Sequence, residues 1–413
     1  MKNIVVVGGG TSGWLTALVV NKFHKDCSVT LIESSKFGIL GAGEGSVPNF
    51  GAMLKLIDIN KVDFFNKTKS TIKDGLNFVN WRGDGKSVKH LFSGESNYTN
   101  VNNGFHFDAK LVAKYFRDLS IERGVVHIDG IIKSCSKDQS NITSLILDND
   151  DVISTDFIFD CSGFNRLIIG KFYNEEWISY NEYLKVNSAV AYFLPQNDKL
   201  SIKDKTQTNM ISMKCGWMWQ APLQHRWGCG YVFNDKYISN EDAKKEIEEY
   251  VQQEIDIVKT FKYEPGYFKR SWVGNSIAIG LSSTFLEPLE STSLMSSIMQ
   301  LKRLIDINFD ESHMKKFNIF CEEVSLQNMI FVRYHYMCGR DDTPFWEDYK
   351  KIKIPMSLSK LVNEDGSLKI KNNLDIYNLL ELRECDMSQL TFFYNNYFTI
   401  HKTNSIKFEH NII

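Results

Sequence analysis

The sequence predicts a mixed α/β fold that is α+β overall, with two sheet-containing modules and a helical C-terminal part. Three observations predict it. The chain opens with a strand, a glycine turn and a helix. Alternating, strand-like segments rich in Trp and Tyr run from about Val186 to Val273. The residues after Pro288 have mostly helical patterns.

The N-terminal segment has the pattern of a βαβ unit. Ile4 to Val7 is a continuous apolar, β-branched run, which is typical of a buried parallel strand. A helical stretch from Thr11 to about Phe23 follows the glycines, and Ser28 to Glu33 is predicted to be the second strand. These elements predict the opening of a Rossmann-like, dinucleotide-binding module.

Further elements of this module are predicted along the chain. Asp108 to Glu122 has apolar residues at helical spacing, and Ser134 to Asp151 is predicted to be a β-hairpin region. Phe157 to Gly163 is predicted to be a buried strand that ends at a glycine. Ser276 to Gly280 is predicted to be a strand that returns to the first module.

The middle of the chain is predicted to form its own sheet, with one helix from Asn240 onward. The chain has no long low-complexity linker, so the modules are expected to be interleaved and fused. We therefore predict a dinucleotide-binding module from residues 1–165 and 270–310, a substrate-side sheet module over 166–269, and a mostly helical part over 311–413 that packs on both.

The composition is that of an ordinary globular protein. Of 413 residues, 43% are hydrophobic and 24% are charged, and a net charge of −2 gives no reason to expect binding to nucleic acid or to a membrane surface. The eight cysteines have neither a CxxC pair nor metal-ligand spacing, which predicts reduced thiols and no metal site. Because the sequence shows neither a secretory signal pattern nor a long apolar run, we expect a cytoplasmic protein.

Gly8, Gly10 and Gly13 form a GxGxxG motif between the first strand and the first helix. Gly8 allows the tight turn, Gly10 lets the backbone approach a pyrophosphate, and Gly13 lets the helix pack on the sheet. The helix N-terminus, at Thr11 and Ser12, supplies amide donors and a partial positive charge to the phosphates.

Glu33 ends the second strand, where its carboxylate can accept hydrogen bonds from the ribose hydroxyls. This fingerprint serves NAD as well as FAD. Asp160 and Gly163, in the strand tip DCSG, favour FAD, because a second strand end against an extended cofactor is typical of flavoproteins. The chain has no second GxGxxG for a nicotinamide nucleotide, so a separate protein is expected to reduce the flavin.

Several segments together resemble the flavin-dependent tryptophan halogenase family. They occur in order over about the first 346 residues: GGGTSGW at 8–14, GAGEGSVPNF at 41–50, HFDAKLVA at 106–113, DCSGF at 160–164, GWMWQAPL at 216–223, GCGYVF at 228–233, WVGNSIAIG at 272–280, FLEPLESTS at 285–293 and RDDTPFW at 340–346. The resemblance implies an FAD/NAD(P)-binding, Rossmann-like module of the flavin monooxygenase type fused to a substrate module. It also places Ala42, Gly43, Glu44 and Leu286 against the cofactor.

The resemblance assigns two catalytic residues. Lys73 opens KDGLNFVNWR and matches the family's catalytic lysine, which holds hypohalous acid by hydrogen bonding or converts it to a haloamine. A desolvated lysine with a lowered pKa can do either. Glu290, in EPLESTS, matches the glutamate that stabilises the developing cation and removes the ring proton.

The family's WxWxIP motif corresponds here to Trp217, Trp219, Ala221 and Pro222. Two indoles beside the flavin would block direct approach of an organic substrate and leave the oxidant for a small anion. Ala221 stands where the family usually has Ile, which opens this wall locally. Two tryptophans at alternate positions are also typical of one face of a core strand, and only the flanking motifs favour the wall.

Thr292 and Ser293 match the positions whose backbone amides bind halide in the family, and amides at a helix start suit an anion. The family has Gly where this chain has Ser293, so chloride, bromide and iodide all remain open. The segment from Trp81 to His106 is short and the chain ends at Ile413, so we expect an open site and a substrate other than free tryptophan. A larger aromatic, an indole in a bigger scaffold, a phenol and a pyrrole remain alternatives.

The resemblance implies that FADH2 from a partner flavin reductase reacts with oxygen, that bound halide becomes hypohalous acid, and that Lys73 delivers it to an aromatic or electron-rich substrate. The alternative is an FAD-dependent monooxygenase that hydroxylates or epoxidises, which needs neither Lys73 nor the tryptophan pair. A third alternative is a flavin-binding sensor or scaffold. Oligomeric state cannot be read from these residues, and a homodimer remains open.

Overall fold

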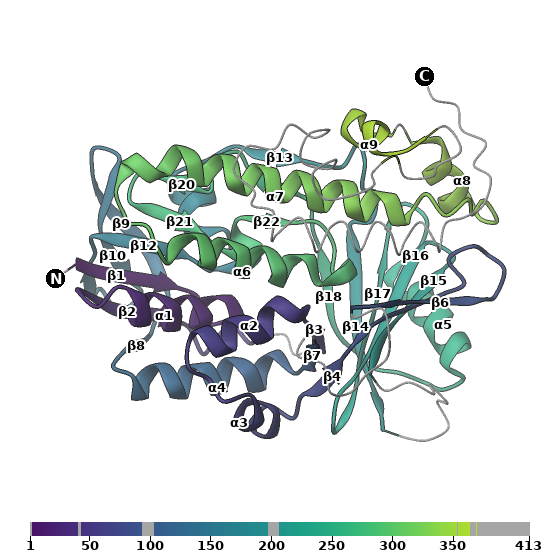
Figure 1. The fold of residues 1–413 in the computed structure, drawn as a ribbon, viewed down its shortest axis with the longest axis horizontal. Coiled ribbons are helices and arrows are strands. Elements are labelled where there is room, and N and C mark those ends of the chain that lie inside the picture. The colour runs from purple at the N-terminus through teal and green to yellow at the C-terminus, as the bar shows by residue number, and fades with distance from the viewer. Residues whose placement is uncertain are drawn as a thin grey trace.

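A computed structural model describes residues 2–39, 43–92, 103–196, 206–352, 354–363 and 369. Two sheet-containing layers lie side by side in Figure 1, with the N-terminal strands at one end and the larger sheet at the other. The long helix α7 (Met314–His335) runs along one edge past both parts. Ala42, which we assigned to the cofactor site, lies outside the described residues.

The first layer is a six-stranded sheet of order β20-β21-β12-β1-β2-β8. Its central strand β1 pairs in parallel with β12 and β2, and β21 and β8 extend the parallel part. The predicted βαβ opening and the returning strand are therefore confirmed. The strands are β1 (Lys2–Val7), β2 (Cys27–Glu33), β8 (Val126–Asp129), β12 (Phe157–Asp160), β20 (Trp272–Val273) and β21 (Ser276–Ala278).

Both faces of β1 are buried, as its continuous apolar run predicts. Ile4 and Val6 pack into the core that includes helix α1 (Thr11–Phe23), whereas Val5 and Val7 pack against the hairpin of β9 and β10. Successive side chains of a strand point to opposite faces, so a strand covered on both sides has no polar alternation.

Three small antiparallel sheets complete the connections. The first, which includes the predicted hairpin, has β9 (Ile132–Asp138), β10 (Asn141–Leu147) and β11 (Val152–Ser154). The second has β3 (Glu44–Gly45), β7 (Gly104–Phe107) and β4 (Thr71–Lys73). The third has β13 (Trp177–Ser179), β19 (Gly266–Phe268) and β22 (Thr284–Phe285).

The second layer is a seven-stranded sheet of order β18-β14-β17-β16-β15-β5-β6, with helix α5 (Asn240–Val251) packed on it. Its strands are β5 (Gly75–Val79), β6 (Ser87–Leu91), β14 (Ser188–Pro195), β15 (Gln207–Met213), β16 (Gly216–Pro222), β17 (Arg226–Phe233) and β18 (Ile257–Lys262). Strands β5 and β6 lie inside residues 1–165, which we had placed in the first module, so that boundary needs correction. β5 joins this sheet by pairing in parallel with β15, a long-range contact that local patterning does not reveal.

The described residues after Pro288 are mostly helical, as predicted. Their helices are α6 (Thr292–Leu304), α7, α8 (Pro344–Lys351) and α9 (Met356–Leu361). Earlier in the chain lie α2 (Pro48–Leu56), α3 (Lys61–Lys67) and α4 (Ala109–Glu122). Short helical turns are η1 (Gly163–Asn165), η2 (Leu167–Phe172), η3 (Gly280–Ser282), η4 (Leu289–Ser291) and η5 (Glu311–His313).

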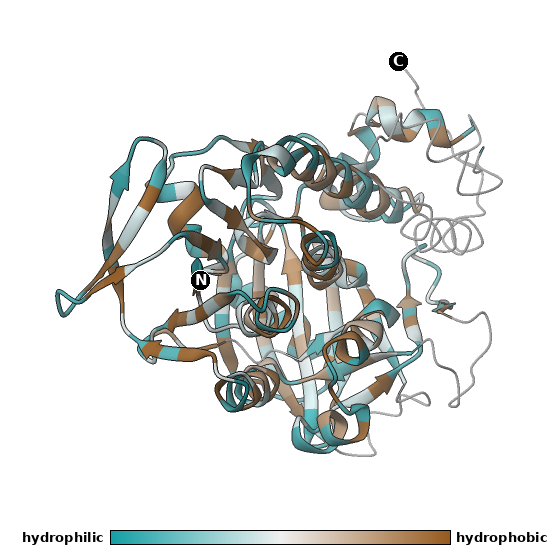
Figure 2. Cartoon of the chain, turned by 60° about the vertical axis from the view of Figure 1, so that its left-hand side comes forward, coloured by the Kyte–Doolittle hydropathy of each residue, from teal (hydrophilic) through white to brown (hydrophobic). Residues whose placement is uncertain are grey.

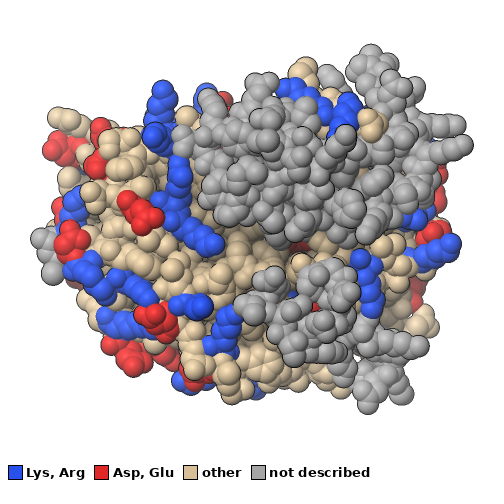
Figure 3. All heavy atoms as spheres, in the orientation of Figure 1, with Lys and Arg blue, Asp and Glu red and all other residues tan. Residues whose placement is uncertain are grey.

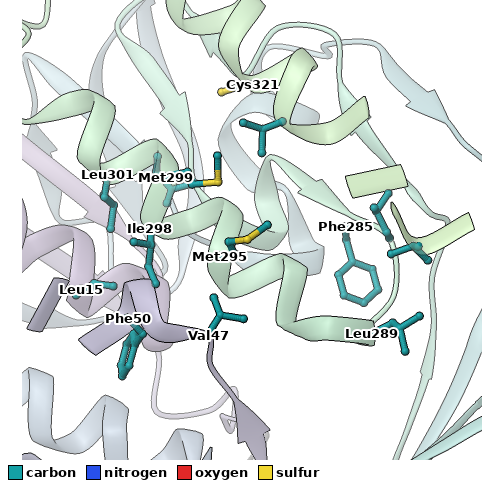
Figure 4. Packing of buried hydrophobic residues seen from close by; sticks show 14 of the residues in the cluster. Leu15, Val47, Phe50, Phe285, Leu289, Met295, Ile298, Met299, Leu301 and Cys321 are labelled. Atoms are coloured by element: carbon teal, nitrogen blue, oxygen red, sulfur yellow. The ribbon is translucent and has the colours of Figure 1, made fainter. Parts of the chain in front are cut away.

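Helix α6 is anchored by apolar contacts. Ile298 projects from it toward Leu15 of α1 and Phe50 of α2, Met295 is buried in the same core, and Leu289 is buried just before the helix begins (Figure 4). Helices around the sheet are hydrophobic on their inward sides and hydrophilic outward (Figure 2). This packing fixes the start of α6 relative to the first layer.

The outer surface carries both signs of charge. On the face shown in Figure 3, Lys and Arg side chains are interspersed with Asp and Glu. None of the helices in the described ranges has the length and apolar character needed to cross a membrane.

Candidate active site

The glycine turn between β1 and α1 is built for close approach. Gly8 has a φ of 109°, and a Cβ at this position would overlap the Cys161 carbonyl oxygen. A Cβ at Gly13 would overlap the Gly8 carbonyl oxygen. In contrast, a Cβ at Gly10 would meet no protein atom within 4 Å. The turn therefore has no room for a side chain at Gly8 and Gly13, where it packs against protein. It is open at Gly10, the glycine expected to face the pyrophosphate.

Glu33 lies beside this turn at the end of β2. A Cβ at Gly9 would overlap its carboxylate, and Glu33 Oε1 is 3.1 Å from His127 Nε2. Burial raises the pKa of Glu33, while His127 acts in the opposite direction. Thr11 and Ser12 stand in the first turn of α1. The open glycine, the helix start and the carboxylate together fit the pyrophosphate and ribose of FAD.

The DCSG tip meets this turn, and the Asp160 carboxylate binds the backbone and the Ser162 side chain of the tip. Its Oδ1 accepts hydrogen bonds from the amide and hydroxyl of Ser162, and its Oδ2 accepts from the amides of Ile168 and Ile169. Each oxygen of the Asp160 carboxylate thus accepts two hydrogen bonds, and these bonds fix the conformation of the tip. Gly163 has a φ of 66°, and a Cβ there would meet no protein atom within 4 Å.

The segment after residue 42 lies against the second layer. Gly43 has a φ of 84° and approaches the Gly228 backbone closely enough to exclude a side chain. Burial and the nearby Asp108 carboxylate raise the pKa of Glu44 to about 7. Leu286 is buried just before the EPLES segment. Gly43, directly before β3, therefore packs against β17.

Lys73 ends β4 and is 1% exposed. Its Nζ donates a hydrogen bond to Ser291 Oγ at 2.9 Å, and a Cβ added at Gly45 would lie 2.8 Å from the same Nζ. Burial lowers the pKa of Lys73 to about 8, and the negative charge of Glu290 opposes this shift. The amine is therefore desolvated and fixed, as the sequence predicts.

Glu290 is fully buried between two imidazoles. Its Oε1 is 2.8 Å from His90 Nδ1 and 3.3 Å from His335 Nε2. Although burial acts to raise the pKa of Glu290, the two histidines outweigh it and hold the pKa well below its usual range. Glu290 is therefore a carboxylate at neutral pH.

The backbone at this point is strained. Glu290 and Ser291 have φ values of 58° and 60°, in the left-handed region. Such a conformation costs roughly 1–2 kcal/mol for each residue other than glycine. It directs Glu290 toward the histidines and Ser291 toward Lys73 from adjacent positions. Buried Leu289 and the contacts of Glu290 hold the turn in place.

The predicted halide positions follow this turn. The Thr292 amide already donates to the Leu289 carbonyl, and its hydroxyl contacts the same oxygen at 3.2 Å. The Thr292 amide is therefore used within the turn rather than free for an anion. Ser293 Oγ is buried and, among the described residues, has no hydrogen-bond partner.

The tryptophan pair lies on β16. The ring centroids of Trp217 and Trp219 are 6.3 Å apart, and a Cβ at Gly230 would overlap the Trp219 indole. Ala221 is buried, and the Pro222 carbonyl accepts a hydrogen bond from the Thr71 hydroxyl, two residues before Lys73. The wall is therefore tied to the strand that carries the lysine.

Five neighbours of these residues were missed by sequence reasoning. Spacing carries no signal for any of them, because each contact joins segments that are distant in the chain. They are His90, His335 and Ser291 around Lys73 and Glu290, and Glu287 and Tyr336 behind Trp217.

The chain is similar to known proteins over most of its length. The chain matches the tryptophan halogenase family over residues 3–102 and 94–374. The tryptophan 7-halogenase RebH of Lentzea aerocolonigenes is 27% identical, over 87% of this chain and 81% of that protein. The tryptophan 6-halogenase SttH of Streptomyces toxytricini has a structure with a TM-score of 0.88 and 24% identity, which covers 98% of this chain and 91% of that chain.

A second solved structure, the flavin-dependent halogenase Xcc4156 of Xanthomonas campestris, gives a TM-score of 0.81 at 26% identity and covers 98% of this chain and 96% of that one. The fold agrees with these matches. The chain belongs to the tryptophan halogenase family of flavin-dependent halogenases.

Proposed function

We propose that Lys73 and Glu290 carry out the halogenation step of this enzyme on an aromatic substrate. The observation that supports this most is the placement of a buried amine and a buried carboxylate on the two sides of one strained turn. Lys73 contacts Ser291, and Glu290 is the preceding residue. Hydroxylation by a flavin monooxygenase needs no such amine.

FAD would be held by the open glycine turn, the start of α1 and Glu33, and when bound and reduced it would supply, with oxygen, the oxidising power that converts halide to hypohalous acid. Trp217 and Trp219 would separate this chemistry from the organic substrate. The small oxidant would pass between them to Lys73, whose ammonium would hold it by hydrogen bonding.

In the substitution step, a ring carbon forms a bond to the halogen while the oxygen–halogen bond breaks. The hydroxide that leaves takes up a proton from the Lys73 ammonium and becomes water, and the ring proton passes to Glu290. The carboxylate also stabilises the cationic ring before the proton leaves. His90 and His335, in contact with Glu290, keep it ionised for both roles.

The substrate, halide and reductant are proposed as follows. The short segment between Trp81 and His106 favours an aromatic substrate larger than free tryptophan. The Ser293 hydroxyl, beside the predicted halide position, favours bromide or iodide over chloride by altering the pocket. A separate flavin reductase supplies FADH2, because the chain has a single dinucleotide fingerprint.

The test combines purified protein, FAD, NADH, an unrelated flavin reductase and oxygen. Indoles, phenols and larger aromatics are each incubated with chloride, bromide or iodide, and products are identified by mass spectrometry. We expect halide-dependent mass shifts that disappear in Lys73→Ala and fall by roughly 10²–10⁴-fold in Glu290→Gln. Oxygen insertion that depends on neither halide nor Lys73 would instead establish a monooxygenase.

A further inference from the structure

A second buried carboxyl group, that of Glu287, lies behind the tryptophan wall. Its Oε1 accepts hydrogen bonds from Trp217 Nε1 at 2.8 Å and from Tyr336 Oη at 2.9 Å. Glu287 and Trp217 are 0% exposed and Tyr336 is 3% exposed. The three residues come from the segment before α6, from β16 and from the end of α7, so the carboxyl joins three elements.

The chemistry of this contact is unusual for a purely structural bridge. Burial raises the pKa of Glu287 to about 8, while the two donors act to lower it. Glu287 Oε2 and the hydroxyl of nearby Tyr263 are both buried and have no hydrogen-bond partner in the described part of the chain. A glutamine would accept the same two hydrogen bonds without a buried ionisable group.

The contact has a geometric consequence for the active site. An indole N–H is a single directional donor, so its partner sets how the ring is turned. Glu287 is three residues before Glu290, on the strained turn that also carries Ser291. The orientation of the Trp217 ring and the placement of the Glu290 turn are therefore coupled through one side chain.

We propose that Glu287 is a positioning residue that holds the Trp217 indole and fixes the wall relative to Lys73 and Glu290. This inference rests on the proposed function of the tryptophan pair as a barrier. Without the carboxyl, the indole N–H and the Tyr336 hydroxyl lose their acceptor, and the ring loses the hydrogen bond that fixes its orientation within the core. The two tryptophans then no longer seal the site of the oxidant. Reduced FAD and oxygen therefore yield free hydrogen peroxide and oxidised FAD instead of halogenated product.

The first test needs no turnover. The protein is labelled with 5-fluorotryptophan, and the Trp217 signal is assigned by its loss in Trp217→Phe. In the parent we expect this 19F signal to shift with a midpoint near pH 8, as Glu287 ionises. The shift should be absent in Glu287→Gln. In Glu287→Leu the signal should move or broaden at all pH values, and an unchanged signal would overturn the proposal.

The second test measures how oxygen is used. We expect the ratio of halogenated product to hydrogen peroxide to fall roughly tenfold in Glu287→Leu, the change in a population ratio that one lost buried hydrogen bond produces. Glu287→Gln should stay within about twofold of the parent, since it keeps both acceptor contacts. A ratio in Glu287→Leu equal to that of the parent would also overturn the proposal.

The control is Glu246→Gln. Glu246 is a buried carboxylate that accepts a hydrogen bond from Tyr231 Oη at 3.0 Å, but it lies on α5 in the separate core of the second layer. Glu246→Gln should change neither the Trp217 19F signal nor the ratio of halogenated product to hydrogen peroxide. If Glu287→Leu does not fold, the smaller substitution Glu287→Ala is measured in its place, and an unchanged Trp217 signal in that variant would likewise overturn the proposal. A parent that makes no halogenated product would refute the proposed function alone, because the 19F result stands without turnover.

Discussion

The Lys73 amine donates a hydrogen bond to the Ser291 hydroxyl at 2.9 Å, although 218 positions separate the two residues. Lys73 ends β4 and Ser291 precedes α6, so the contact joins the small sheet of β3, β7 and β4 to the strained turn of Glu290. The active-site amine is therefore held by the tertiary fold rather than by its neighbours in sequence.

Replacing the lysine should stabilise the protein while removing its activity. The pKa of Lys73 falls from 10.5 to about 8 in the folded state, which corresponds to about 3 kcal/mol of unfavourable burial. The cost of burying the charged amine is fully present below pH 8. It disappears as the pH rises through 10.5, because the amine then becomes neutral in both the folded and the unfolded state. Lys73→Met should therefore raise the free energy of unfolding in urea at pH 7 by up to this amount, and less at pH 10.

The control for this measurement is Lys25→Met, at an exposed position just after α1. It should leave the unfolding free energy within about 0.5 kcal/mol of the parent. A Lys73→Met variant less stable than the parent at pH 7 would show that the buried amine contributes net stability.

The halogenation rate should fall as the pH rises through about 8, because the Lys73 ammonium then loses the proton with which it holds hypohalous acid. Single-turnover product formation between pH 6.5 and 9.5 would measure this. Lys73→Arg, which stays charged, should show no inflection near pH 8. Glu287→Gln should still show the inflection near pH 8. The inflection can then be assigned to Lys73 and not to Glu287, whose pKa is also about 8. A rate that rises with pH would favour the haloamine route.

Crowding the amine should lower activity without unfolding the protein. A Cβ at Gly45 would lie 2.8 Å from Lys73 Nζ, the mobile end of a side chain, so Gly45→Ala should displace the amine. We expect roughly 10²-fold slower halogenation, as for a reacting group moved by about 1 Å. Gly38→Ala is the matched control, because its Cβ would meet no atom within 4 Å. Equal rates in the two variants would argue against a fixed amine.

The cofactor site can be tested at Gly10, where an added Cβ meets no protein atom within 4 Å. Gly10→Ala should leave the stability of FAD-free protein unchanged or raise it by about 0.4–1 kcal/mol. Its affinity for FAD, measured by fluorescence titration, should fall at least about tenfold, because the methyl group occupies the path of the pyrophosphate. Unchanged affinity would place the cofactor elsewhere.

Local patterns in the sequence were enough for the nucleotide-binding half of the fold. The apolar run of β1, the glycine turn and the ends of α1 and β2 are short-range features, and each was predicted close to its observed bounds. The family and the flavin-dependent halogenase class were also predicted, from motifs that occur in order along the chain, and the comparisons confirm them. The roles of individual site residues remain predictions.

Tertiary structure alone decided the surroundings of those residues. Strand β5 joins the second sheet through its pairing with β15, and the Asp160 carboxylate accepts hydrogen bonds from the amides of Ile168 and Ile169. His90 and His335 reach Glu290 from β6 and α7, and no spacing rule could have found them. A sequence specifies periodicity and turn chemistry locally, whereas burial, pKa shifts and hydrogen-bond partners depend on which distant segments pack together.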